Sequence, residues 1–283
     1  MKIDETQNSE LSTLAFDNQH KRSKDIHPDL PHPPMSMLLV GPKGAGKSNL
    51  ILRLLYGNRK PKGASNDYHK FYRHYFDKVY VFSPSWKLDP KMERCKIPDE
   101  QIFDEPIMYT QIIEEILGSQ AEDIEEEGKE ETDNILMVFT DLAGQKGVFS
   151  SAKGIMNKLA FNLRHYNVSL IIDTQSLRQV NSAFRGNLSG CILFSGISNR
   201  LELQKIYDEF LGGFNKDEQE QLIDHCFQGR YDFLFINFQK HGLNRYHHNF
   251  NPLMIRRGVQ NTKEKSKIKD NERYTGTSNH RSC

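Results

Sequence analysis

The sequence predicts an α/β fold with a mostly parallel sheet and helices on both faces. Short apolar runs alternate along the 283 residues with longer segments of helical periodicity, which is typical of strands joined by helices. Several of the runs, such as ILMVFTD, are apolar throughout, and strands of that kind are buried on both faces of a sheet. A glycine-rich turn also joins the first apolar run to the first helical segment. The length suits one large domain.

The expected elements follow one another in a regular order. Strands are apolar runs that end at turn residues, helices have apolar residues at helical spacing, and Gly57 is a plausible stop for the first helix. Strands are expected at residues 36–41, 77–85, 135–141, 167–175, 190–196 and 231–238, and helices at residues 47–57, 155–165, 199–211 and 215–227. Residues 98–118 look partly helical, and the acidic run 119–134 is interpreted as a solvated loop or a helix end.

Composition sets the domain boundaries and excludes several classes of protein. Residues 1–34 are polar and end in HPDLPHPP, which predicts a flexible arm or a strap, residues 35–262 form the main domain, and the polar tail 263–283 is expected to be disordered. The net charge of +1 gives no global basic field, so nucleic-acid contacts would have to come from local patches. The four cysteines lack zinc spacing, and no apolar run is long enough to span a membrane.

The turn after the first strand satisfies G-x-x-x-x-G-K-[ST] in full. It consists of Gly41, Pro42, Lys43, Gly44, Ala45, Gly46, Lys47 and Ser48. Glycines let successive backbone N–H groups point at phosphate oxygens, and the following helix presents its positive end to the same anion. The lysine supplies a charge for the β- and γ-phosphates, and the serine hydroxyl can take one position on Mg²⁺. The motif, known as the Walker A motif or P-loop, predicts binding of a nucleoside triphosphate with Mg²⁺.

A P-loop protein needs a second strand that ends in a carboxylate, and Asp141 is the candidate. Two interpretations are open. Residues 141–145, DLAGQ, look like the D-x-x-G-Q switch of small GTPases, but the guanine-binding N-K-x-D is missing, because NKLA at 157–160 lacks the aspartate. The other is an ATPase with an extra strand between the cradle strand and the acidic strand, a place that residues 77–85 could take. In such enzymes a polar sensor ends the inserted strand, and Gln175 fits that role.

Four segments together resemble the poxvirus-type genome-packaging ATPases of large DNA viruses, virophages and Polinton-like elements, within the FtsK–HerA superfamily. These are GPKGAGKSNLILRLL, FDKVYVFSPS, LMVFTDL and LRHYNVSLIIDTQSLRQVNSAFRGN. The resemblance covers about residues 35–250. It implies a P-loop ATPase in a hexameric ring that drives double-stranded DNA into a capsid, with ATP and Mg²⁺ as ligands and capsid or portal-type proteins as partners. It also implies a location in the host cytoplasm or a virus factory, or in the virion.

The resemblance also assigns roles to residues. Lys47 and Ser48 hold phosphates and Mg²⁺, Gln175 is the sensor, and Arg185 is an arginine finger that reaches a neighbouring subunit. The acidic strand departs from the family pattern of two adjacent acids, because Thr140 precedes Asp141. Either Asp141 is the base and Thr140 serves the Mg²⁺ shell, or Asp141 is the metal residue and the base lies elsewhere. The departure keeps open a non-hydrolysing assembly protein. Candidate DNA contacts are Lys60, Lys62, Arg73, His74, Arg256 and Arg257.

Overall fold

The computed structural model describes residues 26–56, 71–141 and 154–255. The chain divides into two compact units, Met1–Leu253 and Met254–Cys283. All described helices and strands belong to the first unit, and only residues 254 and 255 of the second are described. None of the described helices is both long and apolar enough to cross a membrane.

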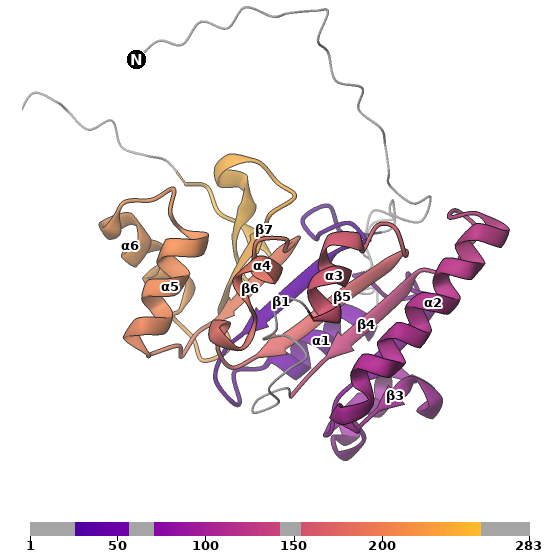
Figure 1. The fold of residues 1–283 in the computed structure, drawn as a ribbon. Helices are drawn as coiled ribbons and strands as arrows, with labels where there is room; N and C mark the ends of the chain where they lie inside the picture. The colour runs from indigo at the N-terminus through magenta and orange to yellow at the C-terminus, as the bar shows by residue number, and fades with distance from the viewer. Residues whose placement is uncertain (1–25, 57–70, 142–153, 256–283) are drawn as a thin grey trace, which may run out of the picture. The chain divides into compact units, whose positions relative to one another are not determined.

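A nine-stranded sheet forms the centre of the first unit, with the strands in the order β3-β2-β4-β5-β1-β6-β7-β8-β9 (Figure 1). The six strands from β3 to β6 in that order pair in parallel, and β7, β8 and β9 are added antiparallel, so the predicted mostly parallel sheet is confirmed. The strands are β1 Ser36–Val40, β2 Lys78–Phe82, β3 Ile102–Phe103, β4 Ile135–Phe139, β5 Val168–Thr174, β6 Gly190–Phe194, β7 Phe233–Asn237, β8 Tyr246–His248 and β9 Asn251–Pro252.

Three of the described helices, α4, α5 and α6, begin after an asparagine whose side chain caps them. The Asn199 side chain accepts hydrogen bonds from two backbone N–H groups of the first turn of α5, and Asn215 forms a capping box with Glu218 at the start of α6. α2 continues through most of the acidic run, so the helix alternative for that run is confirmed. The helices are α1 Lys47–Tyr56, α2 Tyr109–Glu127, α3 Ile155–Asn162, α4 Ser182–Arg185, α5 Arg200–Phe210 and α6 Lys216–Cys226.

Helices cover both faces of the central strands. Every residue of β1, β4, β5 and β6 is buried, which requires apolar cover on each side. Alternate strand residues, among them Leu39 and Ile171, form one cluster with Ile51 of α1. In Figure 1, α3 and α4 lie on the opposite face of the sheet from α1. The cradle strand β1 therefore runs through the middle of a three-layered arrangement.

An inserted strand separates the cradle strand from the acidic strand, but it is β5 and not the segment 77–85. β5 pairs with β1 on one side and with β4 on the other, whereas β2 lies beyond β4. All seven residues of β5 are buried, while the first three of β2 are only partly buried, as expected of a strand nearer the sheet edge. The expected sheet is confirmed, and the identity of its inserted strand is corrected.

Residues 26–34 form a strap on the first unit, although the predicted boundary places them in the arm. Ile26 and Leu30 are buried in the core. The Asn237 side chain donates to the Asp29 carbonyl at 2.9 Å, and Lys240 forms an ion pair with the Asp29 carboxylate. The Tyr72 hydroxyl donates to the Pro31 carbonyl at 2.8 Å. The ordered domain thus begins before residue 35.

Candidate nucleotide site

The loop between β1 and α1 lies where an anion can meet the positive end of a helix. Backbone amides at the start of α1 have no partner one turn earlier in the helix, and they point out of its N-terminal end. Gly46 has a φ of +102°, a conformation that side chains strongly disfavour, and it lets the backbone turn before Lys47. The predicted strand–turn–helix context of the motif is confirmed.

The ammonium group of Lys47 lies over this loop. Its Nζ donates to the Gly41 carbonyl at 2.9 Å and to the Pro42 carbonyl at 3.2 Å. Burial lowers the pKa of Lys47, and the carboxylates of Asp173 and then Asp141 act against that effect. The lysine is therefore a cation that bonds the loop carbonyls and is influenced by the charges of two acidic side chains.

The end of β4 places its two polar residues in different surroundings. Thr140 is buried, and its hydroxyl donates to Ser83 Oγ at 2.7 Å. Asp141 is exposed and has a φ of +54°, which is uncommon for an aspartate outside a turn. Its carboxylate accepts a hydrogen bond from the Ser85 hydroxyl. Ser83 and Ser85 follow β2, and they contact the two polar residues at the end of β4. In the sequence, these contacts are marked only by the Ser-Pro-Ser turn.

Asp173 is a site residue that the sequence reasoning missed. It lies in β5 and is 3% exposed, and its Oδ1 accepts a hydrogen bond from the Asp141 backbone N–H at 3.2 Å. Burial raises its pKa to about 6, although Lys47 and the Asp141 amide act to lower it. A signal was present, because an aspartate interrupts the apolar run VSLIIDT. Its place beside the cradle could be known only from the strand order.

The raised pKa predicts that Asp173 lowers the stability of the nucleotide-free protein. An acid whose folded pKa exceeds its unfolded value of about 3.8 costs stability as pH rises from that value through the folded pKa of about 6. The Asp173→Asn variant should thus unfold with a higher free energy than wild type. We expect the gain to grow between pH 4 and pH 6 and to level off at about 2–3 kcal/mol.

Urea unfolding of both proteins without nucleotide across this pH range measures the effect. Asp208→Asn on the exposed side of α5 is the control and should change little at any pH. An equal effect of Asp173→Asn at pH 4 and pH 8 would show that the carboxylate charge is not the cause.

Gln175 directly follows β5 at the same edge of the sheet and is exposed. It lines a cavity of about 260 Å³ together with Pro42 of the loop and Asn199. A second cavity of about 330 Å³, lined by Lys43, Gly44 and Arg230 among others, borders the loop as well. Arg230 is a further cation close to the loop that the sequence reasoning did not single out. The structure therefore brings the predicted sensor position next to the predicted cradle.

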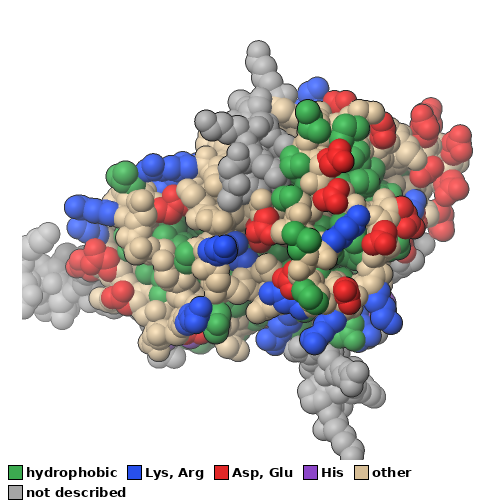
Figure 2. Space-filling view, turned by 90° about the horizontal axis from the view of Figure 1, so that it is seen from below, with side chains coloured by type: hydrophobic (Ala, Val, Ile, Leu, Met, Phe, Trp, Pro, Cys, Tyr) green, Lys and Arg blue, Asp and Glu red, His purple; other side chains and the backbone are tan. Residues whose placement is uncertain are grey.

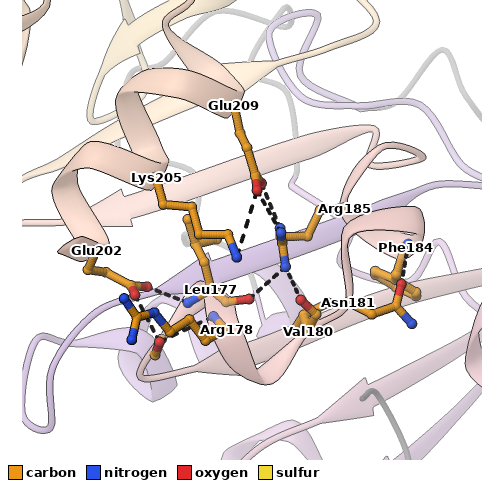
Figure 3. Close-up of polar contacts among 10 residues, drawn as sticks. Leu177, Arg178, Val180, Asn181, Phe184, Arg185, Glu202, Lys205 and Glu209 are labelled. Atoms are coloured by element: carbon orange, nitrogen blue, oxygen red, sulfur yellow. Dashed lines mark hydrogen bonds and ion pairs between the residues drawn. The ribbon is translucent and has the colours of Figure 1, made fainter. Parts of the chain in front are cut away.

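Arg185 is buried within its own subunit (Figure 3). Its guanidinium donates to both carboxylate oxygens of Glu209 on α5 at 2.6 Å. It also donates to the carbonyls of Leu177 and Val180 in the turn after β5. Reaching a neighbouring subunit as an arginine finger requires these bonds to break, so the finger stays a prediction.

The remaining expectations fall into two groups. Lys60, Lys62, Gln145, Arg256 and Arg257 lie outside the described residues. Of the other basic candidates, Arg73 lies over the Tyr56 ring, with its guanidinium 5.1 Å from the ring centre, and donates to His74.

Mg²⁺ fits the residues at the loop. Across the described parts of the chain, no group of three or more His, Cys, Asp or Glu side chains could hold a metal ion alone. A site of this type needs fewer protein ligands, because Mg²⁺ usually keeps several waters and binds phosphate oxygens together with one or two side chains. Ser48, in the first turn of α1, and the acidic residues facing Lys47 supply such oxygens.

The close packing around Gly41 offers a steric test of the loop. A Cβ atom there would lie 2.7 Å from Phe194 Cβ and 3.3 Å from Ala45 Cβ, closer than side chains allow. We expect Gly41→Ala to lower the free energy of unfolding by about 1–3 kcal/mol and to weaken nucleotide binding. In α2, Gly118→Ala meets nothing within 4 Å and should instead stabilise the helix by about 0.5–1 kcal/mol. Denaturation curves that rank the two variants in the opposite order would contradict this packing.

The comparisons with known proteins bear on the fold. No protein-family model and no curated protein matches the chain. The DNA-packaging ATPase B204 from Sulfolobus turreted icosahedral virus is similar, with a TM-score of 0.53 and 13% identity over 78% of this chain and 98% of that chain. The genome packaging NTPase B204 from Sulfolobus turreted icosahedral virus 2 is similar in complex with AMP, with a TM-score of 0.51 and 13% identity over 78% of this chain and 98% of that chain. In complex with AMPPCP, the same NTPase has a TM-score of 0.50 and 14% identity, over 79% of this chain and 100% of that chain. The chain thus has the fold of viral genome-packaging NTPases, as the sequence resemblance implied.

Proposed function

We propose that this protein is an ATP-driven motor that assembles into a hexameric ring and moves viral double-stranded DNA into a capsid. The observation that carries the proposal is the joint placement of the cradle, Asp141 and Gln175 at one sheet edge, with the sensor strand β5 between β1 and β4. The shared fold with viral packaging ATPases supports it. Capsid or portal-type proteins are the partners that such a motor needs.

The residues of the site divide the work of hydrolysis. The loop amides and Lys47 hold the β- and γ-phosphates. The Ser48 hydroxyl would be one ligand of the Mg²⁺ ion. Mg²⁺, when bound with ATP, neutralises charge on the phosphates. Asp141 takes the proton of the attacking water as its oxygen bonds to the γ-phosphorus and the bond to the β–γ bridging oxygen breaks. Gln175 donates a hydrogen bond to the water or to the phosphate.

The charge distribution restricts where DNA can bind. Figure 2 shows acidic side chains gathered at the side of the molecule where α2 lies, while Lys and Arg are spread over the rest of that face. The second half of α2 carries Glu122, Asp123, Glu125, Glu126 and Glu127. Phosphates would be repelled there, so the DNA-facing side of a ring would lie away from the end of α2.

Steady-state ATP hydrolysis by the purified full chain, with and without double-stranded DNA, tests the proposal. We expect DNA of any sequence to raise the turnover rate and added salt to remove the stimulation, because phosphate contacts are screened. Competition of ATP with GTP for binding should favour ATP. Turnover that is unchanged by DNA over a range of salt and DNA lengths contradicts a translocating motor. A preference for GTP would indicate the switch-like alternative, and binding without turnover would indicate a non-hydrolysing assembly protein.

A further inference from the structure

We propose that Asp173 is the carboxylate on the metal side of the nucleotide site, in the role for which the sequence offered Thr140 or Asp141. The inference rests on the proposed function in one respect, because it takes ATP with Mg²⁺ as the ligand. It assigns the two roles that the sequence left open: Asp173 binds the metal, and Asp141 takes the proton of the attacking water.

Thr140 is poorly placed for the metal. Its side chain is buried, and its hydroxyl hydrogen is donated to Ser83 Oγ at 2.7 Å, on the β2 side of β4. β2 lies on the side of β4 away from the cradle strand. A neutral hydroxyl is also a weaker partner for Mg²⁺ than a carboxylate. The position at which the family pattern expects an acid is therefore filled by a residue that ties two strands together.

Asp173 lies next to that position, on the same face and one strand nearer to the cradle. Phe139 pairs with Ile172, so the following residues, Thr140 and Asp173, are at the same level of the sheet. Neighbouring residues on parallel strands point to the same face. Asp173 also pairs with Leu39 of β1, which packs in the same cluster as Ile51 of α1. The carboxylate thus lies on the face that α1 covers, and α1 begins with Lys47 and Ser48.

The Asp141 carboxylate, in contrast, is held on the β2 side of β4. Its carboxylate accepts from Ser85, which follows β2, while its backbone N–H points to Asp173. Asp173 is therefore the inner acid of the pair and Asp141 the outer, solvent-exposed one.

The burial of Asp173 requires a cation. Within the described residues, its one hydrogen bond comes from the Asp141 amide, although a carboxylate can accept about four. A buried charge with so few partners is normally compensated by an ion pair or a metal. Lys47 acts on this carboxylate only through space, because its ammonium group bonds the Gly41 and Pro42 carbonyls. When Lys47 bonds a phosphate instead, the same carboxylate needs a second cation, and Mg²⁺ arrives with the triphosphate.

Calorimetric binding of AMPPCP, an analogue that is not hydrolysed, tests the proposal with either MgCl₂ or EDTA present. In wild type we expect Mg²⁺ to tighten binding at least tenfold. Asp173→Asn should keep the affinity measured in EDTA and lose most of the Mg²⁺-dependent gain. Asp141→Asn should keep the gain and lose ATP turnover. Asp208→Asn is the matched control and should resemble wild type in each measurement.

The readout separates this inference from the proposed function. A wild-type Mg²⁺ gain that Asp173→Asn retains in full overturns the inference, whatever DNA does to turnover. Loss of the gain in Asp141→Asn but not in Asp173→Asn also overturns it. Wild type that shows the gain but no DNA stimulation contradicts the motor and leaves the inference standing. Circular dichroism checks folding, and Asp173→Ala replaces the asparagine variant if that variant does not fold. An alanine variant that keeps the Mg²⁺-dependent gain in affinity also overturns the inference.

Discussion

Lys47→Ala should lower the affinity for ATP by about 10²- to 10³-fold and abolish measurable hydrolysis. The ammonium group of Lys47 bonds the Gly41 and Pro42 carbonyls of the loop. Two unit charges about 4 Å apart near a protein surface attract by about 4 kcal/mol, and each 1.4 kcal/mol corresponds to a tenfold change in affinity. Titration with a fluorescent ATP analogue and a phosphate-release assay measure both effects.

The control for Lys47→Ala is Lys158→Ala, which removes an exposed lysine from α3. This variant keeps the loop intact and should bind ATP within about twofold of wild type, since isolated surface charges contribute little. Circular dichroism and urea unfolding of both variants separate a binding defect from a folding defect. A folded Lys47→Ala protein that binds ATP as wild type does would show that the loop does not grip a triphosphate through this lysine.

Arg185→Ala should lower the free energy of unfolding by about 3 kcal/mol. The substitution removes a two-pronged ion pair with Glu209 and one donor from each of the Leu177 and Val180 carbonyls, of which Leu177 keeps the Val180 amide. Breaking a buried ion pair costs about 3–5 kcal/mol, and the lower end applies because Glu209 is partly exposed. Arg178→Ala, on the exposed side of the same turn, should change stability by less than about 0.5 kcal/mol.

The same variants decide between a structural role and a role in a neighbouring subunit. A double-mutant cycle of Arg185→Ala with Glu209→Ala should give a coupling energy of about 1–3 kcal/mol in chemical unfolding. An arginine that acts only as a finger would show no coupling and no loss of stability, and its removal would lower turnover alone. The cycle therefore tests the finger prediction whatever the oligomeric state of the protein.

How far the sequence predicts this site depends on the range of the contacts involved. The cradle follows from local pattern, because glycines, a lysine and a helix start are consecutive in the chain. The central strands follow from apolar runs that are buried on both faces. The place of β5 between β1 and β4 does not follow, since strand order is a property of the whole sheet. Asp173 and its neighbours become a cluster only after that order is known.

Other misses have similar causes. The bond between Arg185 and Glu209 joins residues 24 positions apart, and no local pattern marks it. The short strands β3, β8 and β9 have too few residues for a periodic signal. For residues 26–34 the sequence left an arm or a strap open, and two buried aliphatic side chains and several hydrogen bonds make them a strap fixed to the domain. In each case a distant partner decides the outcome.

The turn after β5 is held at both of its ends by one helix. Glu202 of α5 accepts from the Leu177 amide and the Ser176 hydroxyl, and Glu209, two turns further along, holds Arg185 against the Leu177 and Val180 carbonyls (Figure 3). The residues that follow Gln175 are thereby clamped to a rigid rod about 16 Å long. On the proposed mechanism, a shift of Gln175 on meeting the terminal phosphate would tilt the whole rod, so that chemistry at the loop would become mechanical displacement far from it.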